Sequence, residues 1–219
     1  MNVEQSPLEF LAEAQTITIE NTPFEGYPNG DSTRYIEIYG LEGIETLIRG
    51  TLRHVGWSAI FQTLHEIGWF SDQPADRVIE KTQRATISDA VRSTVDWLGL
   101  EQAPAEAISA FDHLKRQFLN QQDLDYRAGE QDQLIMYHQF EVEGVAGERE
   151  QVTAELLIVG DRDGHSAMAK TVGLPCAIGA CLIARGEFNA AGVQLPTVKG
   201  VYAPVLEELG RHGVTFREG

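Results

Sequence analysis

The sequence predicts an α+β fold, in which helices cover a mixed, largely antiparallel sheet in two layers and a small all-helical subdomain is inserted. Strand-like runs of alternating apolar and polar residues occur in the first third and again after the middle of the chain. Apolar residues at helical spacing fill the stretch between them. With 219 residues and 42% hydrophobic content, the chain can bury the core of one or two domains.

The first strand-containing region extends to about Phe70. The helix expected at its end carries an apolar stripe that includes Trp57, Phe61 and Leu64, and it stops at Gly68, a residue type suited to helix ends. The elements expected here are a short helix after Pro7, a strand at 16–20, a loop with Asn29-Gly30, a strand at 45–54 and a helix at 57–67.

The inserted subdomain is expected at residues 74–119. Ile87, Val91, Val95 and Leu98 share one helical stripe, and a second stripe runs from Ile108 to Phe118. Pro74 and Pro104 stand at plausible helix starts. The two flanking segments, residues 1–73 and 120–185, would then form one sheet domain.

The last region returns to strands. Apolar and polar residues alternate over 134–142, and a connection containing Gly144 and Gly147 leads to a second apolar run at 152–159. This pattern predicts an antiparallel hairpin. A long helix at 166–185, interrupted near Pro175, a helix at 204–209 and a short strand at 214–216 complete the expected elements.

A basic row marks the strand predicted at residues 45–54. Side chains alternate across a strand, so Arg49, Thr51 and Arg53 project from one face, while Leu52 lies on the other. Guanidinium groups bind carboxylates well. In a chain of formal net charge −16, such a row predicts a local site for carboxylates, although spacing alone equally fits an exposed, charged sheet face.

Composition excludes several classes of protein. The 33 acidic residues exceed the 17 basic ones, which argues against binding to nucleic acid. Cys176 and Cys181 fit neither a disulfide framework nor a zinc site. No signal peptide is recognisable, and the apolar run at 172–184 is too short to span a bilayer. We therefore expect a cytoplasmic protein that does not contact membranes.

Catalytic motifs are not found. No Gly-x-Gly-x-x-Gly follows a predicted strand, so a dinucleotide-binding fingerprint is missing. No histidine or carboxylate spacing suggests a metal site, and no nucleophile elbow is present. His138 lies on the apolar face of its strand, where a core histidine is more probable than a general base. We therefore assign neither catalytic nor metal-binding residues to this chain.

Several blocks in order resemble the saccharopine dehydrogenase (saccharopine reductase) family. The strongest is Met168-Ala-Lys-Thr-Val-Gly-Leu-Pro-Cys-Ala177, and the set spans nearly the whole chain. The remaining blocks are Phe24–Thr33, Tyr39-Gly40, Ile48–Arg53, Gly129–Leu134 with His138, Tyr202–Leu209 and Gly213–Phe216. Because the family's nucleotide-binding fingerprint is missing, the chain resembles the substrate-binding and dimerisation region that follows the Rossmann domain.

The resemblance implies a function for the parent protein. It implies NADP- or NAD-dependent hydride transfer to or from a secondary amine or imine in lysine (2-aminoadipate) metabolism, by a homodimer, with the cofactor bound mostly by a domain absent here. The isolated chain should be inactive. Residues 186–219 would form a tail that packs on that missing domain. Thr51, Leu52 and Arg53 match positions that contact substrate, and Thr171 and Gly173 lie where cofactor could approach.

One departure leaves the substrate open. The family usually has an arginine where this chain has Gly30, and Arg34, four residues later, is the candidate to replace it. A related enzyme for another carboxylated amine, such as carboxynorspermidine dehydrogenase, therefore stays an alternative. A non-catalytic dimerisation module is the second alternative, and it predicts stable dimers without affinity for carboxylated amines.

Overall fold

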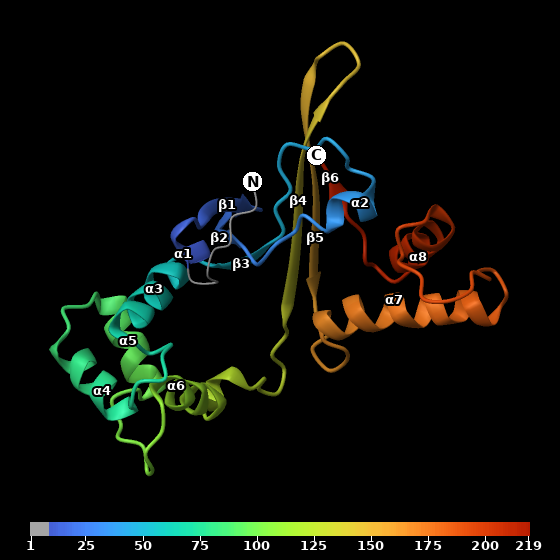
Figure 1. Ribbon diagram of the computed structural model, residues 1–219. Helices are drawn as coiled ribbons and strands as arrows, with labels where there is room; N and C mark the ends of the chain where they lie inside the picture. Colours follow the sequence, from blue (N-terminus) through green and yellow to red (C-terminus); the bar gives the residue numbers. More distant parts are fainter. Residues whose placement is uncertain (1–8) are drawn as a thin grey trace. The chain divides into compact units, whose positions relative to one another are not determined.

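The structure, a computed structural model, describes residues 9–219. Its contacts group the chain into two compact units, of which the first ends at Asp125 and the second begins at Tyr126 (Figure 1). Each unit contains one three-stranded antiparallel sheet together with helices. The predicted α+β class is therefore confirmed, but two small antiparallel sheets replace the single mixed sheet that the sequence suggested.

The sheet of the first unit consists of β1 (Gln15–Ile19), β2 (Thr22–Pro28) and β3 (Gly50–His54), in that order. A two-residue turn at Glu20 and Asn21 joins β1 to β2, and both turn residues have positive φ, as tight hairpins require. Strand β2 was not predicted, because its two prolines and Gly26 are typical of a loop.

The predicted strand at 45–54 is wrong in its first half. Strand β3 begins at Gly50, which lies opposite Pro28, the last residue of β2. Residues 45–49 have no strand partner within residues 9–219, apart from a hydrogen bond from the Asn29 amide to the Arg49 carbonyl at 3.0 Å. A Cβ at Gly50 would lie 2.6 Å from the Tyr27 carbonyl oxygen, so the backbones approach more closely than a side chain permits.

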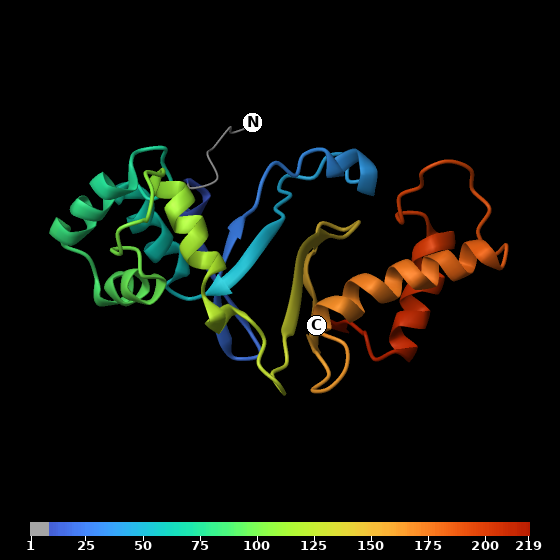
Figure 2. The same ribbon diagram turned by 90° about the horizontal axis from the view of Figure 1, so that it is seen from below.

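Helices of the first unit occupy both ends of this sheet. Helix α2 (Tyr35–Tyr39) lies at one end, and α3 (Trp57–Ile67) leads from the other end into a helical cluster (Figure 2). Serine side chains cap two helices, Ser88 that of α5 and Ser109 that of α6. The remaining helices of this unit are α1 (Glu9–Ala12), α4 (Ala75–Arg84), α5 (Asp89–Leu98), α6 (Ala110–Leu119) and the 3₁₀ turn Gln122–Leu124.

The main core of the first unit lies among α3–α6. Leu64 from α3, Val78 from α4 and Val95 from α5 are fully buried in one cluster. The indole nitrogen of the buried Trp69 donates to the hydroxyl of Thr82 at 3.0 Å, so this buried donor is satisfied. The helices expected at 74–119 are therefore present, but they share their core with α3, which precedes them.

The second unit is built on a long hairpin. Its strands are β4 (Gln133–Glu143) and β5 (Arg149–Val159), as predicted, and β6 (Arg217–Glu218) pairs with β5. Helices α7 (Ala167–Ala184) and α8 (Lys199–Arg211) lie on one side of the hairpin (Figures 1 and 2). Leu156, Leu209 and Val214 form the centre of a small core between them.

Helix α7 is apolar on almost every side, yet only Ala167 and Leu182 are buried. Its exposed surface includes Met168 at 58%, Val172 at 62% and Ile183 at 61%. By length and composition this helix could cross a membrane. The apolar run that the sequence placed at 172–184 is thus extended at its start, but a single such helix among residues 9–219 is weak evidence for a membrane span.

The predicted domain boundaries differ from this division into units. The sequence assigned residues 1–73 and 120–185 to one sheet domain, 74–119 to an insertion and 186–219 to a tail. Within residues 9–219, the last segment contributes α8 and β6 to the second unit. The predicted boundaries and the contact of the tail with a further domain stay predictions.

Candidate functional site: an arginine and aromatic surface in the first unit

Arg53 lies at the centre of an aromatic group on β2, β3 and α3. Its guanidinium carbon lies 5.2 Å from the centroid of the Trp57 ring, within range of a cation–π contact. Trp57 stacks on Phe61 with centroids 3.9 Å apart, and Tyr27 lies parallel to the Trp57 ring at 5.8 Å. The Arg53 Nη1 donates to the Leu52 carbonyl at 2.9 Å, so one edge of the guanidinium is held in place.

Glu25 holds the start of α3 rather than pairing with Arg53. The two residues are direct partners across β2 and β3, where opposite charges normally attract. The Glu25 carboxylate instead accepts hydrogen bonds from the Gly56 amide at 2.7 Å and the Ser58 amide at 2.8 Å. Partial burial opposes ionisation of Glu25, but these two hydrogen bonds outweigh it and lower its pKa.

A second group of cations surrounds Tyr35 in α2. The Arg34 Nη2 donates to the Tyr35 hydroxyl at 2.9 Å. The guanidinium carbons of Arg34 and Arg49 lie 4.9 Å and 4.2 Å from the centroid of the same ring. The hydrogen bond from Arg34, with a smaller effect of Arg49, lowers the pKa of Tyr35 below its ordinary value of 10.0.

The three arginines share one property. Within residues 9–219, none of Arg34, Arg49 and Arg53 forms an ion pair with a carboxylate. What sets these three apart, in a chain with net charge −16, is that each exposed guanidinium lies over an aromatic ring. Guanidinium groups are planar donors suited to carboxylates, so this surface can hold a ligand that carries several of them.

Thr51 and Leu52 occupy opposite faces of β3. Thr51 lies across from Tyr27 and is half-buried, on the face that carries Arg53. Leu52 packs on the other face, where its side chain approaches Gly26 beside Ile17. The structure therefore gathers Thr51 with Arg53 and separates Leu52 from them.

Gly30 leaves open space where the resemblance led us to expect an arginine. Its φ is 147°, and no atom lies within 4 Å of the position that a Cβ would take. The adjacent Asn29 is joined to Arg49 by the hydrogen bond at the end of the β2–β3 ladder. The loop that lacks the expected arginine thus lies next to the cation pair formed by Arg34 and Arg49.

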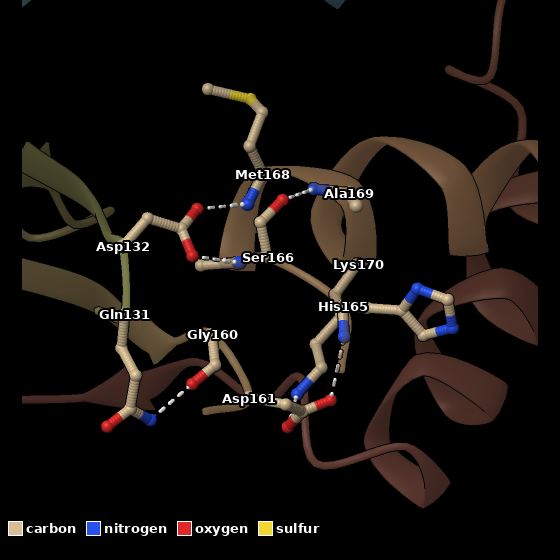
Figure 3. A network of polar contacts seen from close by, with 10 residues as sticks. Gln131, Asp132, Gly160, Asp161, His165, Ser166, Met168, Ala169 and Lys170 are labelled. Carbon is tan, nitrogen blue, oxygen red and sulfur yellow. Dashed lines mark hydrogen bonds and ion pairs between the residues drawn. The ribbon is translucent and has the colours of Figure 1, made fainter. Parts of the chain in front are cut away.

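Thr171 and Gly173, which were predicted to meet a cofactor, lie within the first seven residues of α7. The polar groups at the start of this helix are already paired with one another (Figure 3). The Asp132 carboxylate accepts from the amides of Ala167 at 2.6 Å and Met168 at 2.9 Å. The Ser166 hydroxyl accepts from the Ala169 amide at 3.0 Å. Hydrogen bonds from the Met168 and Ala167 amides lower the pKa of Asp132, although partial desolvation opposes them.

These contacts do not form a nucleotide site. A helix N-terminus binds phosphate through free amides, whereas here a carboxylate and a serine occupy them. The Thr171 hydroxyl donates to the Ala167 carbonyl at 2.9 Å, and Gly173 is exposed on the helix surface. Lys170 forms an ion pair with Asp161. The residues present therefore do not fit a bound dinucleotide by themselves, and we assign no reaction step to one.

Sequence reasoning missed Glu25, Tyr35 and Trp57 as parts of this surface. Trp57 was assigned to a helix stripe, and the contact with Arg53 depends on how β3 joins α3. Tyr35 stands directly after Arg34 in the sequence, but nothing local indicates that Arg49 reaches the same ring. Glu25 could have been found only from the register of β2 and β3.

Other features of the described residues offer less chemistry. Residues 9–219 contain no group of three or more histidine, cysteine or carboxylate residues arranged to hold a metal. His138 is exposed and packs edge-on against Phe216, so its predicted core position is wrong. A cavity of about 340 Å³ beside it, between the hairpin and α8, has a mainly apolar lining that includes Phe140 and Leu206.

Comparisons with known proteins agree with the resemblance seen in the sequence. The family model of the saccharopine dehydrogenase C-terminal domain matches residues 2–214. The mitochondrial alpha-aminoadipic semialdehyde synthase of Bos taurus is 33% identical over 224 residues, which cover 88% of this chain and 24% of that protein. The saccharopine dehydrogenase [NADP(+), L-glutamate-forming] of Schizosaccharomyces pombe is 29% identical, over 89% of this chain and 51% of that protein.

A solved structure has the same fold. Apo histidine-tagged saccharopine dehydrogenase (L-Glu forming) from Saccharomyces cerevisiae superposes with a TM-score of 0.81 at 26% identity, over 96% of this chain and 54% of that one. The chain thus spans about a quarter to a half of the length of these relatives. It belongs to the saccharopine dehydrogenase family, whose members include oxidoreductases of lysine metabolism, and corresponds to the C-terminal domain of that family.

Proposed function

We propose that this chain is the substrate-binding part of an oxidoreductase that acts on saccharopine or a closely related carboxylated secondary amine. The supporting observation is the surface on which Arg34, Arg49 and Arg53 present guanidiniums without acidic partners within residues 9–219. Thr51 adds a hydroxyl beside Arg53. These groups would bind and orient the carboxylates of the substrate, with Leu52 supporting the strand from behind.

The chemistry would be completed outside this chain. NADP or NAD supplies hydride transfer to or from the carbon–nitrogen bond when it is bound. We assign its binding mostly to a further domain of the parent protein, because α7 presents no free phosphate-binding amides. Thr171 and Gly173 stay candidates for contact at the edge of that domain. The chain alone should then bind carboxylated amines without oxidising or reducing them.

Exposed apolar side chains indicate where the further domain would pack. Val193 and Leu195, in the segment between α7 and α8, are exposed at 100% and 54%, and α7 carries the exposed face described above. Large apolar patches on a protein surface usually mark contact sites. We propose that the segment 186–219 and α7 contact the missing domain. Homodimer formation and a cytoplasmic location stay predictions.

A binding experiment tests the proposal directly. The 219-residue chain is titrated with saccharopine by calorimetry, alongside its Arg53→Ala variant. Loss of a charge-assisted hydrogen bond of about 1.5–3 kcal/mol should weaken binding by roughly tenfold or more. Arg84→Ala is the control, because this exposed arginine pairs only with Glu80 on α4. If the chain does not bind saccharopine, or the Arg53→Ala variant binds it normally, the proposal is wrong.

Calorimetry with a second amine, together with sedimentation, separates the two alternatives. An enzyme similar to carboxynorspermidine dehydrogenase predicts tighter binding of carboxynorspermidine than of saccharopine. Gly30 favours keeping this candidate, because one expected guanidinium is missing there. A non-catalytic dimerisation module predicts dimers in sedimentation measurements and no heat of binding with either amine.

A further inference from the structure

We propose that Tyr35 gathers Arg34 and Arg49 into one carboxylate-binding subsite, distinct from Arg53, in which both guanidiniums act on the same anionic group. The inference deepens the proposed function and rests on it for the choice of a carboxylate. Tyr35 is a positioning residue in this arrangement, because it acts through the two arginines.

The ring of Tyr35 is the common point of both cations. The guanidinium carbons of Arg34 and Arg49 lie 4.9 Å and 4.2 Å from its centroid, and its hydroxyl accepts the hydrogen bond from Arg34. Tyr39 stacks on Tyr35 with centroids 5.5 Å apart, which braces the ring on the short helix α2. Two long arginine side chains, otherwise free to separate, are thus held beside one another.

Within residues 9–125, neither arginine of this pair forms an ion pair. Asp31 is the acidic group that interacts electrostatically with Arg34. Its Oδ1, however, accepts hydrogen bonds from the Thr33 amide at 2.9 Å and the Thr33 hydroxyl at 2.7 Å. Neither arginine forms an ion pair with a described carboxylate. Two adjacent cations repel each other, so an anion placed between them binds more strongly than at either alone.

Arg53 is too far along the chain to share this anion. It follows Arg49 by four positions, which corresponds to about 13 Å of extended chain. Arg53 is also held at the opposite end of β3, over Trp57. The open space at Gly30 adjoins the Arg34 and Arg49 pair through Asn29. The subsite therefore occupies the place of the expected arginine and receives a second carboxylate of the ligand.

The pKa of the Tyr35 phenol can be measured to test this subsite even when the natural substrate is not known. The chain has six tyrosines, and subtraction of the ultraviolet titration of Tyr35→Phe isolates the Tyr35 phenol. We expect it to ionise at lower pH than an ordinary tyrosine, and Arg34→Met and Arg49→Met each to raise its pKa. Glutarate, as a carboxylate probe, should raise the pKa of Tyr35 because it offsets the guanidinium charge.

Affinity for glutarate tests whether the two arginines share one anion. Arg34→Met and Arg49→Met should each weaken glutarate binding by about tenfold or more. The double variant should lose much less than the product of the two losses, because coupled groups are not additive. Tyr35→Leu should weaken binding, while Tyr39→Phe, which keeps the stacked ring and touches neither arginine, should behave as the unchanged chain. Circular dichroism confirms that each variant is folded.

Several outcomes overturn the inference. Glutarate binding that leaves the Tyr35 titration unchanged, multiplicative losses in the double variant, or an unaffected Tyr35→Leu variant would each contradict it. A response to inorganic phosphate without one to glutarate contradicts the assignment of a carboxylate. Failure of saccharopine to bind, while glutarate still shifts Tyr35, removes the proposed substrate and leaves the subsite intact.

Discussion

Two polar regions of the molecule differ in whether their charges have partners. At the start of α7, Asp132 accepts two backbone amides and Lys170 pairs with Asp161. In the first unit, Arg34, Arg49 and Arg53 rest on aromatic rings of α2 and α3 without a described carboxylate as ion-pair partner. A network that satisfies its own groups stabilises a fold, whereas cations left without partners indicate a ligand. The comparison predicts that substitutions at the start of α7 affect stability. Substitutions among the three arginines should affect ligand binding.

The largest effect on stability is expected at Asp132. Asp132→Ala removes the acceptor of two amides in the first turn of α7, so it should destabilise the second unit more than Ser166→Ala, whose loss of a cap costs about 1 kcal/mol. Thermal unfolding and hydrogen exchange at the amides of Ala167 and Met168 measure the effect. Ligand affinity should not change. A weaker effect than that of Ser166→Ala would show that water replaces the carboxylate.

Acid unfolding provides the pH counterpart of this prediction. The folded-state pKa of Asp132 is depressed below the ordinary value of 3.8, so its contribution to stability is present above that pH and is lost as the pH falls through the folded value. In the Asp132→Ala variant this part of the acid transition should disappear. An unchanged acid transition would assign it to other carboxylates.

Glu25 affects both stability and the arginine surface. Its carboxylate binds the amides at the start of α3 and therefore leaves Arg53 without an ion-pair partner. Glu25→Gln keeps one acceptor but loses the charge, and should cost about 1 kcal/mol at the start of α3. Such a loss corresponds to about 2–4 °C in Tm for a protein of this size. Saccharopine binding should weaken only to the extent that Trp57, the first residue of α3, shifts with the helix end. If affinity instead rises, Glu25 competes with the ligand for Arg53.

Protonation of His113 should destabilise the first unit at low pH without changing Arg34, Arg49 or Arg53. Burial, reinforced by Arg116, lowers the pKa of His113 below 6.5, and the ring packs against Trp69 with centroids 5.9 Å apart. Its contribution to stability is present above pH 6.5 and is lost as the pH falls toward the folded value, because the unfolded chain binds the proton first. Denaturant unfolding between pH 7 and pH 5 should show this loss in the unchanged chain and not in His113→Phe.

The smallest effect is expected at Thr171. Its hydroxyl donates to the Ala167 carbonyl within α7, a contact that contributes little to helix stability. Thr171→Val should therefore change the free energy of unfolding by less than about 0.5 kcal/mol and leave saccharopine binding unchanged. A clear loss of saccharopine affinity would place α7 in the substrate site and remove the contrast between the regions.

The sequence predicted best where a local pattern specifies an element. The helix at 57–67 was predicted with its observed bounds, because its apolar stripe ends at Gly68, which adopts the positive φ of a helix C-terminus. The β4–β5 hairpin followed from alternation and its glycine-containing turn. Helix α8 begins at Lys199, before the predicted start at Pro204, so this proline lies inside a helix that packs against α7.

Prediction failed where the structure depends on distant partners. Strand β2 exists because it pairs with both β1 and β3, although its own sequence is typical of a loop. The basic strand was extended too far because nothing in residues 45–49 shows that β2 ends opposite Gly50. The arginines were recognised from alternation and family resemblance. Their aromatic partners depend on how α2 and α3 pack beside the arginines, and the sequence alone could not predict this packing.

The contact of Trp57 with Arg53 also provides an intrinsic fluorescence signal for ligand binding. An indole with a cation 5.2 Å from its ring centroid emits in a field that changes when an anion reaches that cation. Of the other two tryptophans, Trp69 is fully buried and hydrogen-bonded to Thr82, whereas Trp97 is 40% exposed and must be replaced by phenylalanine to isolate the Trp57 signal. In a Trp97→Phe variant, occupation of Arg53 can therefore be followed by intrinsic fluorescence, and small carboxylic acids can be screened as ligands without a turnover assay.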